Sequence, residues 1–285
     1  MNSFIKNERT MTPKVALITG GGGAIAEAIA IRLDKLGYDL VLSDISKEKM
    51  STIVSKLSRK PELIVCDQTK ASDVESLIGM IQQKYPHIDL LVNNAGYTKV
   101  GPVLDMDSSE IERHSMINMI SPIRLIHGLV PLMLNRGRGA VVSIVSIGSI
   151  VALADSALYS ATKFGLRGFL TALHEELRGT GIKVSGIYPA AVDTPMLMHE
   201  ALHGGSVLNW VNAVKSPDDI AKAVLRGAET GRMEIYVPYS DGLTSRLAAV
   251  FPWLIGRLSP ILKWIGEKGR RRWLRKKGIQ SISKN

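Results

Sequence analysis

The chain is poor in cysteine, and it shows no internal repeat or low-complexity segment before residue 240. The single cysteine, Cys66, excludes an intramolecular disulfide and favours a reducing compartment. Because Cys66 ends the apolar run LIVC at 63–66, we expect it to be a small buried core residue. The lack of repetition and the hydrophobic content of 45% exclude a collagen-like or disordered chain and favour one large α/β core.

Acidic residues are almost missing from the end of the chain. Residues 256–285 hold ten Lys or Arg and one acid, Glu267, whereas residues 1–255 hold 26 basic and 25 acidic residues. The formal net charge of +10 therefore belongs to the tail, and the body is close to neutral. The first thirteen residues are polar and lack an apolar segment, so we expect a flexible arm and no secretory signal there.

Short apolar runs of strand type alternate with segments of helical period between residues 14 and 240. This alternation predicts a single Rossmann-type α/β domain, in which helices cover both faces of a doubly wound parallel sheet of about seven strands. The candidate strands are 15–19, 39–44, 63–67, 89–94, 140–146, 183–189 and 233–238.

Glycine is concentrated at the first strand-to-helix turn, where residues 19–27 read TGGGGAIAE. Glycines let the backbone approach a pyrophosphate, and the amino end of the next helix offers free N–H groups to it. Asp44 ends the second strand, where a carboxylate can bind the adenosine ribose hydroxyls and repel a 2′-phosphate. No Lys or Arg adjoins Asp44 or occupies the glycine turn, so we expect NAD(H) rather than NADP(H). The alternative role for Asp44 is a helix N-cap.

Tyr159 and Lys163 lie four residues apart in YSATK, a spacing that places both side chains on one helix face. Free tyrosine has a pKa of about 10, so proton exchange with an alcohol near neutral pH needs a neighbouring positive charge, which Lys163 can supply. The pattern alone is common by chance on a solvated helix face. Ser146 strengthens it, because this hydroxyl ends a β-branched run typical of a buried parallel strand and is expected at the ligand-binding crevice.

In order and spacing, these features resemble the single-domain branch of the short-chain dehydrogenases/reductases over about residues 14–240. The matching segments are TGGGGAIA (19–26), Asp67, NNAG (93–96), Asn118, Ser146, YSATK (159–163) and PAAVDTP (189–195). The resemblance implies a nicotinamide-dependent alcohol or ketone oxidoreductase with four catalytic residues, Asn118, Ser146, Tyr159 and Lys163. It implies cofactor contacts from Gly20, Gly23, Ala24, Ile25, Asp44, Asp67, Gln68, Asn94, Ala95, Gly96, Tyr159, Lys163, Val192 and Thr194.

The resemblance also implies a role for each group. Tyr159 exchanges the proton, Ser146 hydrogen-bonds the substrate oxygen, and Lys163 holds the ribose while lowering the Tyr159 pKa. Asn118 fixes a water in the proton relay. The adenine would lie between Asp67 and Gln68, residues 94–96 would line the cofactor cleft, and the nicotinamide carboxamide would be held by Val192 and Thr194.

The glycine turn departs from the family pattern TGxxxGxG, because Ala24 and Ala26 stand at its second and third glycines, and Ala190 replaces the glycine of a PG pair. A methyl group at Ala24 would crowd the pyrophosphate unless the glycines at 21–23 relax the turn. The pattern GxGxxA also fits at 21–26, so the register stays open. The alternatives are a non-catalytic nucleotide-binding regulatory protein of the same fold and a reductase of 3-oxoacyl-type substrates.

Residues 195–214 are rich in Met, Leu and Trp in place of a regular helix, and the resemblance implies a lid over the substrate. The alternative for each apolar residue is an ordinary core-facing helix position. An apolar lid predicts a hydrophobic secondary alcohol or ketone of steroid, retinoid, terpenoid or acyl type. The six histidines lack metal-ligand spacing, so we expect no metal and predict surface or lid positions for them. The lid candidates are Met196, Leu197, Met198, Leu202, Leu208 and Trp210.

Residues 241–285 are predicted to form an apolar and then basic C-terminal extension. Prolines and an arginine interrupt its apolar part, whose longest uncharged stretch is ten residues, and one membrane-spanning helix needs about 20 apolar residues. Three tryptophans beside the basic run predict an interfacial anchor on an anionic membrane through 247–277. Dimer or core packing is the first alternative, and nucleic-acid binding is the last. We therefore expect a cytoplasmic protein that is peripheral on the membrane. The resemblance to the family also implies a homodimer or homotetramer.

Overall fold

A seven-stranded parallel sheet forms the centre of the structure, a computed structural model that describes residues 13–279. The predicted arm at 1–13 therefore lies outside the described residues except for Pro13. The strand order β3-β2-β1-β4-β5-β6-β7 confirms the predicted doubly wound fold, and every predicted strand bound is within two residues of the observed one. The strands are β1 (Val15–Thr19), β2 (Asp39–Asp44), β3 (Glu62–Val65), β4 (Leu90–Asn93), β5 (Gly139–Ile144), β6 (Ile182–Pro189) and β7 (Glu234–Val237).

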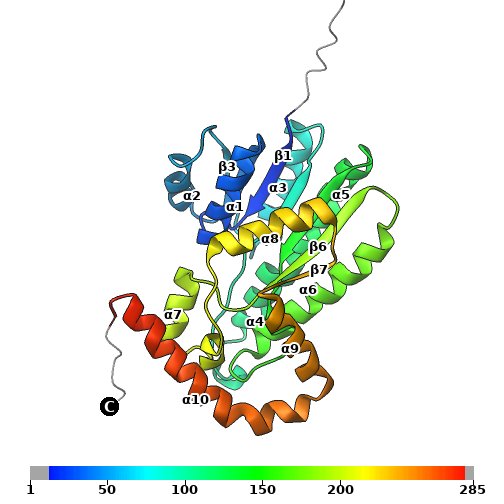
Figure 1. Cartoon of the computed structure of the whole chain (residues 1–285). Helices are drawn as coiled ribbons and strands as arrows, with labels where there is room; N and C mark the ends of the chain where they lie inside the picture. The colour runs from blue at the N-terminus through cyan, green and yellow to red at the C-terminus, as the bar shows by residue number, and fades with distance from the viewer. Residues whose placement is uncertain (1–12, 280–285) are drawn as a thin grey trace, which may run out of the picture.

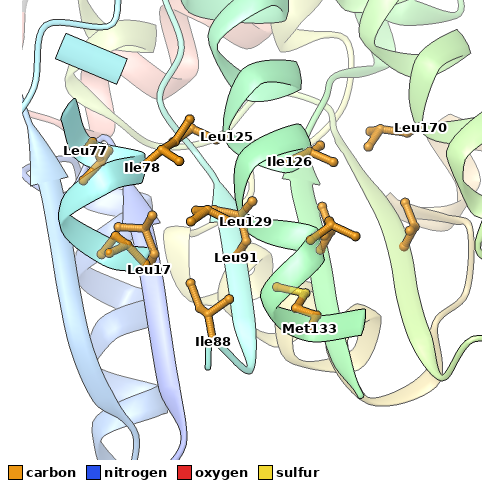
Figure 2. Packing of buried hydrophobic residues seen from close by; sticks show 14 of the residues in the cluster. Leu17, Leu77, Ile78, Ile88, Leu91, Leu125, Ile126, Leu129, Met133 and Leu170 are labelled. Carbon is orange, nitrogen blue, oxygen red and sulfur yellow. The ribbon is translucent and has the colours of Figure 1, made fainter. Parts of the chain in front are cut away.

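Alternate strand residues pack into two separate cores, one on each face of the sheet. Val15 and Leu17 of β1 join the core under α3 (Ala71–Lys84), α5 (Ser121–Leu134) and α6 (Ala157–Glu176), part of which Figure 2 shows. Ala16 and Ile18 point to the opposite core. That core is covered by α1 (Ala24–Lys35), α2 (Lys47–Val54) and α8 (Pro217–Thr230).

One helical stretch among the described residues, Ser109–Leu134, is long and apolar enough by length and composition to span a membrane. It comprises α4 (Ser109–Ser115), the π-helical turn η2 (Met116–Ile120) and α5. Leu125, Leu129 and Met133 of α5 are 0% exposed and pack on the sheet, as Figure 2 shows. The apolar character of this stretch is therefore used in the core.

The strand order reverses direction between β1 and β4, and the carboxyl ends of these strands meet at that point. In open α/β sheets ligands bind in the crevice at such a reversal. The fold thus gathers at one edge the glycine turn after β1, the loop after β4 and the segment after β5. Residues that are distant in sequence become neighbours there.

The C-terminal extension is helical throughout its described part, with α9 (Tyr239–Val250) followed by α10 (Pro252–Lys276). Pro252 lies in the first turn of α10 and Pro260 lies inside it, so the helix continues through the apolar segment that these prolines interrupt in the sequence. Figure 1 shows α10 leaving α9 and running along α7 (Pro195–His203). Its inner face packs on the short helix η4 (Val207–Trp210), where a Cβ atom at Gly269 would lie 2.0 Å from the Trp210 carbonyl oxygen.

A buried carboxylate fixes the start of the extension to the sheet. Glu234 of β7 accepts hydrogen bonds from Arg167 Nε at 2.7 Å, from the Tyr236 hydroxyl at 2.6 Å, and from the Arg246 guanidinium. Burial opposes ionisation, but these hydrogen bonds and the two guanidinium charges hold the pKa of Glu234 below its usual value. The ion pairs therefore join α6, β7 and α9 at one buried point.

Candidate active site

The glycine turn is held against the end of β4. Gly20 has a φ of +61°, and a Cβ atom there would lie 2.8 Å from Ala95 Cα, so both the backbone conformation and the close contact require glycine. The Asn94 backbone N–H donates to Thr19 Oγ1 at 3.0 Å, and its side-chain amide donates to the Thr19 carbonyl at 2.9 Å. The predicted segment 94–96 therefore adjoins the turn.

The two alanines of the turn are accommodated by the start of α1. Gly23 is the N-cap residue and provides no side-chain cap, so the first amide groups of α1 stay available to an anion. Ala24 is the first helical residue and Ile25 the second, whereas Ala26 is 0% exposed in the core beneath the helix. The methyl group of Ala26 therefore faces the sheet, and the positive φ of Gly20 favours TGxxxGxG over the other register.

The Asp44 carboxylate bridges the glycine turn and the entry to α2. It accepts hydrogen bonds from the Gly22 backbone N–H at 3.0 Å and from the Ser46 backbone N–H at 3.1 Å. The N-cap of α2 is Ser46, so the alternative prediction of an Asp44 cap is wrong. A basic residue nevertheless lies near, because a Cβ atom at Gly22 would lie 2.5 Å from Lys49 Cβ. Lys49 is distant in sequence from the glycine turn, so no signal in the sequence indicates this contact. The first turn of α2 brings the two segments together.

Asp67 and Gln68 follow β3 at the same edge. Asp67 Oδ1 accepts hydrogen bonds from the Thr69 backbone N–H at 3.0 Å and from its hydroxyl at 2.7 Å. Although burial raises the pKa of Asp67, these hydrogen bonds leave it below the usual value. Gln68 is buried, and its side-chain carbonyl oxygen has no hydrogen-bond partner among the described residues. An unpartnered buried acceptor next to an ionised carboxylate fits a polar ring such as adenine.

Val192 forms an isolated parallel bridge with Lys215. The two hydrogen bonds of this bridge come from the residues on either side of Val192. The Asp193 N–H donates to the Lys215 carbonyl at 2.8 Å, and the Lys215 N–H donates to the Ala191 carbonyl at 2.9 Å. The Val192 amide therefore points to the other side, because successive backbone groups of a strand alternate in direction. Thr194 caps α7 by accepting from the Leu197 N–H at 3.3 Å. This geometry is compatible with binding of a carboxamide by Val192.

Ser146 and Tyr159 converge on Gly148. A Cβ atom at Gly148 would lie 3.3 Å from Ser146 Oγ and 3.4 Å from Tyr159 Cε1, so the two side chains meet across a glycine. Ser146 Oγ accepts a hydrogen bond from the Gly148 N–H at 2.9 Å, which leaves its own proton free to be donated. Burial raises the pKa of Tyr159 to about 12, and the hydrogen bond from Ser146 opposes this rise.

Lys163 is 3% exposed and donates from Nζ to the Ile144 carbonyl at 2.9 Å. Its Nζ lies 5.8 Å from the centroid of the Tyr159 ring, and burial lowers the pKa of Lys163 to about 8. Desolvation disfavours both charges, and Ser146 supplies the hydrogen bond that stabilises the Tyr159 phenolate, so the role of Lys163 in lowering the Tyr159 pKa stays a prediction. The shared helix face predicted for the two residues is confirmed.

Asn118 is 0% exposed and lies in the π-helical turn η2, a distortion often found at functional sites. Its side chain accepts from the Tyr97 N–H at 2.9 Å and donates to the Tyr97 carbonyl at 2.8 Å. It also donates to Thr162 Oγ1 at 3.3 Å. A Cβ atom at Gly96 would lie 3.7 Å from Asn118 Oδ1 and 4.0 Å from Lys163 Nζ. Asn118 thus joins the loop after β4 to the helix that carries Tyr159 and Lys163, and its water-binding role stays a prediction.

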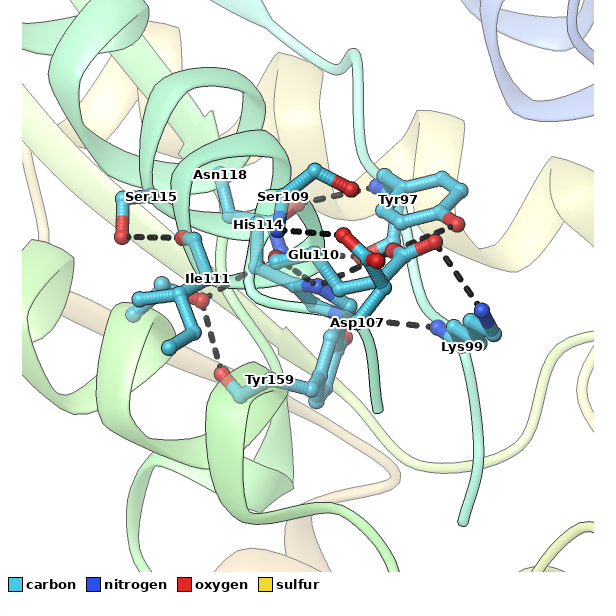
Figure 3. A network of polar contacts seen from close by, with 11 residues as sticks. Tyr97, Lys99, Asp107, Ser109, Glu110, Ile111, His114, Ser115, Asn118 and Tyr159 are labelled. Carbon is cyan, nitrogen blue, oxygen red and sulfur yellow. Dashed lines mark hydrogen bonds and ion pairs between the residues drawn. The ribbon is translucent and has the colours of Figure 1, made fainter. Parts of the chain in front are cut away.

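A polar network supports this loop, as Figure 3 shows. Glu110 accepts hydrogen bonds from the Tyr97 hydroxyl at 2.9 Å and from Lys99 Nζ at 3.1 Å. His114 is 0% exposed and accepts from the Lys99 backbone N–H at 3.2 Å. The predicted surface or lid position of the histidines is therefore wrong for His114, and also for His87, which is 8% exposed. No spacing signal marks these two residues, because tertiary packing decides their burial.

The predicted lid is a helix followed by a short turn, so the expectation of an irregular segment is wrong for 195–203. Leu197 and Trp210 are buried with Leu274 of α10, and Met198 packs against this small core. These three buried residues and Met198 therefore pack segment 195–214 against α10. Leu208 is partly buried in η4, and two lid candidates remain exposed, Met196 and Leu202.

Glu200 is a site residue that the sequence analysis did not identify. It lies on α7 and accepts a hydrogen bond from Asn209 Nδ2 at 2.7 Å. Burial raises the pKa of Glu200 to about 7, and the Asn209 hydrogen bond opposes this rise. Its negative charge in turn raises the pKa of Tyr159. An acid amid apolar residues in the predicted lid was the only sequence signal for it.

Cys66 is buried as predicted, and burial raises the pKa of its thiol to about 11. Among residues 13–279, no group of three or more His, Cys, Asp and Glu side chains is arranged to hold a metal ion. His199 and His203 stack on each other with ring centroids 4.2 Å apart.

Comparison with known proteins matches this fold and site. A family described as short chain dehydrogenase matches residues 14–203. An uncharacterized oxidoreductase of Staphylococcus aureus (strain MRSA252) is 32% identical over 217 residues, which are 75% of this chain and 90% of the relative.

Two solved structures are similar to most of the chain. A short-chain dehydrogenase from Sphingobium yanoikuyae in complex with NADPH has a TM-score of 0.73 and 26% identity, covering 86% of this chain and 95% of that one. A metagenomic short-chain oxidoreductase in complex with NADP has a TM-score of 0.67 and 28% identity, covering 78% and 96%.

Proposed function

We propose, from the premise that the chain belongs to the short-chain dehydrogenase family, that it interconverts a hydrophobic secondary alcohol and its ketone with NAD(H). Membership itself makes the chain an oxidoreductase whose fold binds a nicotinamide cofactor. The observation that carries the proposal is the convergence of Ser146 and Tyr159 across Gly148, with Lys163 buried on the same helix. A regulatory protein without turnover would not need this complete arrangement.

The residues of the chain divide the proton chemistry. When bound, the nicotinamide cofactor supplies or accepts the hydride. Tyr159 donates its hydroxyl proton to the carbonyl oxygen in reduction, and as phenolate it takes the alcohol proton in oxidation. Ser146, whose oxygen accepts from the Gly148 N–H, would direct its hydroxyl proton to the same substrate oxygen, which stabilises charge that develops there. A tyrosine is protonated at neutral pH in any case, and burial raises the pKa of Tyr159 further, which makes removal of its proton harder.

The site fits the cofactor at three places. The uncapped first turn of α1 offers amide groups to a pyrophosphate, the Asp44 carboxylate lies at the glycine turn, and the Val192 amide points away from Lys215. The buried Nζ of Lys163 would hold the ribose, since it lies 4.0 Å from a Cβ atom built at Gly96, in the loop after β4. These residues belong to five separate chain segments, which only the folded sheet brings together.

NAD(H) preference rests on Asp44, whose charge would repel a 2′-phosphate. Lys49 opposes this reading, because it packs against Gly22 and an ammonium near that point would attract the phosphate. We expect kcat/KM to be higher with NAD(H) than with NADP(H). The Asp44→Ala variant should reduce this difference in kcat/KM, and the Lys49→Ala variant should increase it. If turnover is faster with NADPH than with NADH, and if this preference disappears in the Lys49→Ala variant, the cofactor is NADP(H) instead.

The hydrophobic substrate rests on the segment 195–214. Met196 and Leu202 expose apolar side chains on α7, and the Glu200 carboxylate on the same helix raises the pKa of Tyr159, which supports a lid role for this helix. Steady-state rates with a panel of alcohols of increasing apolar size test this reading. A preference for small polar alcohols would contradict the substrate class without affecting the assignment of Tyr159.

The Tyr159→Phe variant tests catalysis, because it removes only the ionisable oxygen. We expect turnover to fall at least about 100-fold while cofactor affinity, measured by fluorescence titration, stays near that of the unmodified protein. The matched control is Tyr239→Phe, since Tyr239 is exposed at the start of α9. If Tyr159→Phe retains more than about a tenth of the rate, Tyr159 is not the proton donor.

A further inference from the structure

Helix α10 has two different faces. The inner face carries Gly266 and Gly269, whose missing side chains let the helix backbone approach the carbonyl oxygens of Val207 and Trp210. Leu274, 4% exposed, joins the same small core, and the Trp273 and Trp210 rings lie 6.0 Å apart. This face is fully used in packing against the body of the protein.

The outer face of α10 carries exposed apolar side chains. Trp253, Ile261 and Trp264 are 58%, 59% and 60% exposed. At 100° per residue these positions lie within about 80° of each other and on the opposite side of the helix from Gly266. On α9, Leu243 and Leu247 are also exposed, at 52% and 59%.

The gathering of these side chains is specific to this part of the molecule. Among the described residues, ten of the 21 exposed large apolar side chains lie between positions 239 and 265. Single exposed apolar residues are normal on a protein surface, but a contiguous group marks an interaction site. The exposed side chains of α9 and α10 therefore have the composition expected of an interaction surface.

Basic side chains border this apolar surface and continue it along α10. The Arg257 guanidinium lies 5.1 Å from the Trp253 ring centroid, and Lys268 Nζ lies 3.5 Å from the Trp264 ring centroid. Further along the same helix Arg271 and Arg275 are exposed on the outer face. The outer face thus begins with tryptophan and isoleucine and ends with arginine.

We propose that the outer face of α9 and α10 docks on an anionic membrane surface. Tryptophan and isoleucine would insert at the level of the lipid headgroups, and the flanking lysines and arginines would contact lipid phosphates. A second copy of the chain fits less well: parallel pairing of this face would oppose two basic segments, and antiparallel pairing would place apolar residues against basic ones. Nucleic acid would leave the aliphatic residues of α9 without a partner.

Docking would place the lipid beside the lid, because the inner face of the same helix packs on η4. Arg270 donates to the Ala201 carbonyl at 3.4 Å, and Lys277 Nζ lies 2.6 Å from Asp193 Oδ2, so α10 holds both ends of α7. A hydrophobic substrate dissolved in the bilayer would then lie one helix, α10, away from α7. This last consequence rests on the proposed function, whereas docking itself does not.

Co-sedimentation of the full chain with vesicles of phosphatidylcholine, with and without phosphatidylserine, tests the proposal independently of activity. The double variant Ile261→Asp/Trp264→Asp should lose at least about tenfold in vesicle affinity, and its control Met80→Asp, on exposed α3, should not. The triple variant Arg257→Glu/Lys268→Glu/Arg275→Glu, which changes three exposed residues of the outer face, should lose about 100-fold or more in affinity for anionic vesicles. Its charge-matched control, Lys35→Glu/Arg138→Glu/Arg232→Glu, changes exposed residues at the opposite end of the strands and should bind nearly as the unmodified protein.

Salt should weaken attachment without abolishing it, since the apolar part of the interaction is not screened. The absence of pelleting on anionic vesicles at low salt would overturn the proposal. So would full binding by the Ile261/Trp264 variant. A dimer that dissociates in this variant, without vesicle binding by the unmodified chain, would assign the face to a second copy. Binding of a duplex RNA probe in preference to vesicles would overturn the proposal in favour of nucleic acid.

Discussion

The sheet domain and the C-terminal helices use apolar residues in opposite ways. Leu17 and Ile18 of β1 are 0% exposed, whereas Trp253 and Trp264 of α10 are about 60% exposed. The charges differ as well, with a net of +1 for residues 1–238 and +9 for residues 239–285. Mean hydropathy alone does not distinguish the two uses, because the most membrane-like helix by composition, Ser109–Leu134, is a core helix. Only the exposed fraction of each side chain separates a core from an interaction surface.

The two regions are nevertheless joined at the substrate side. Trp210 and Leu274 share a small core, and Glu234 is ion-paired with Arg246 of α9. The extension is therefore partly an integral piece of the fold and partly an exposed surface. The predicted alternative of core packing is supported for its inner face, while the outer face carries the proposed membrane contact.

The sharpest separation of the two regions should come from Lys163. The Lys163→Ala variant should lower kcat/KM by about 100-fold or more and weaken cofactor binding, because one buried ammonium would serve both the ribose and the proton transfer. Vesicle binding should be unchanged, and Lys35→Ala, an exposed lysine, is the control for lost charge. Unchanged cofactor affinity in Lys163→Ala would contradict its dual role.

Glu234 tests the junction between the regions. The Glu234→Ala variant should lower the free energy of unfolding by about 3 kcal/mol, because it leaves Arg167 and Arg246 without their carboxylate at a buried point. Chemical denaturation measures this loss, and Glu229→Ala, an exposed glutamate at the end of α8, is the control. A loss as small as that of the control would show that α9 is held by its apolar contacts alone.

Glu200 predicts a pH dependence of stability. Its folded pKa of about 7 lies above the ordinary value of 4.5, so the unfolded chain loses this proton first and the free energy of unfolding falls as pH rises between them. The Glu200→Gln variant cannot ionise and should be more stable than the unmodified protein by ~3 kcal/mol at pH 8, with little difference at pH 4. Denaturation midpoints at both pH values measure this, with exposed Glu176→Gln as control. Equal midpoints at pH 8 would show that Glu200 is not desolvated.

Substitutions of two glycines in α10 should distinguish the part of the helix that packs on η4 from the part that is exposed. Their expected effects on the free energy of unfolding are smaller. Gly269→Ala should destabilise the protein by about 1–2 kcal/mol, because the new methyl group would overlap the Trp210 carbonyl. Gly256→Ala should stabilise it by about 0.5–1 kcal/mol through helix propensity, since no other atom lies within 4 Å of a Cβ atom there. The same sign for both variants in thermal unfolding would mean that α10 does not pack on η4.

Local patterns in the chain determined the fold and the four catalytic candidates. Alternating strand and helix periods gave the strand bounds, and the spacing of Tyr159 and Lys163 was sufficient because residues four apart share a face of any regular helix. Ser146 follows the same logic, since the carboxyl ends of parallel strands meet at one edge. These features depend on residues close in sequence or on rules common to all parallel sheets.

Contacts between distant segments were decided only by the tertiary structure. The approach of Lys49 to Gly22, the burial of His114 and Trp210, and the action of Glu200 on Tyr159 all join elements that no periodicity relates. The tertiary structure also decided the two faces of α10. Its apolar residues are of the same types on both faces, although one face packs on η4 and the other is exposed. Sequence determines which residues can be buried, but the packing of whole elements decides which of them are, and thereby sets their pKa values and their partners.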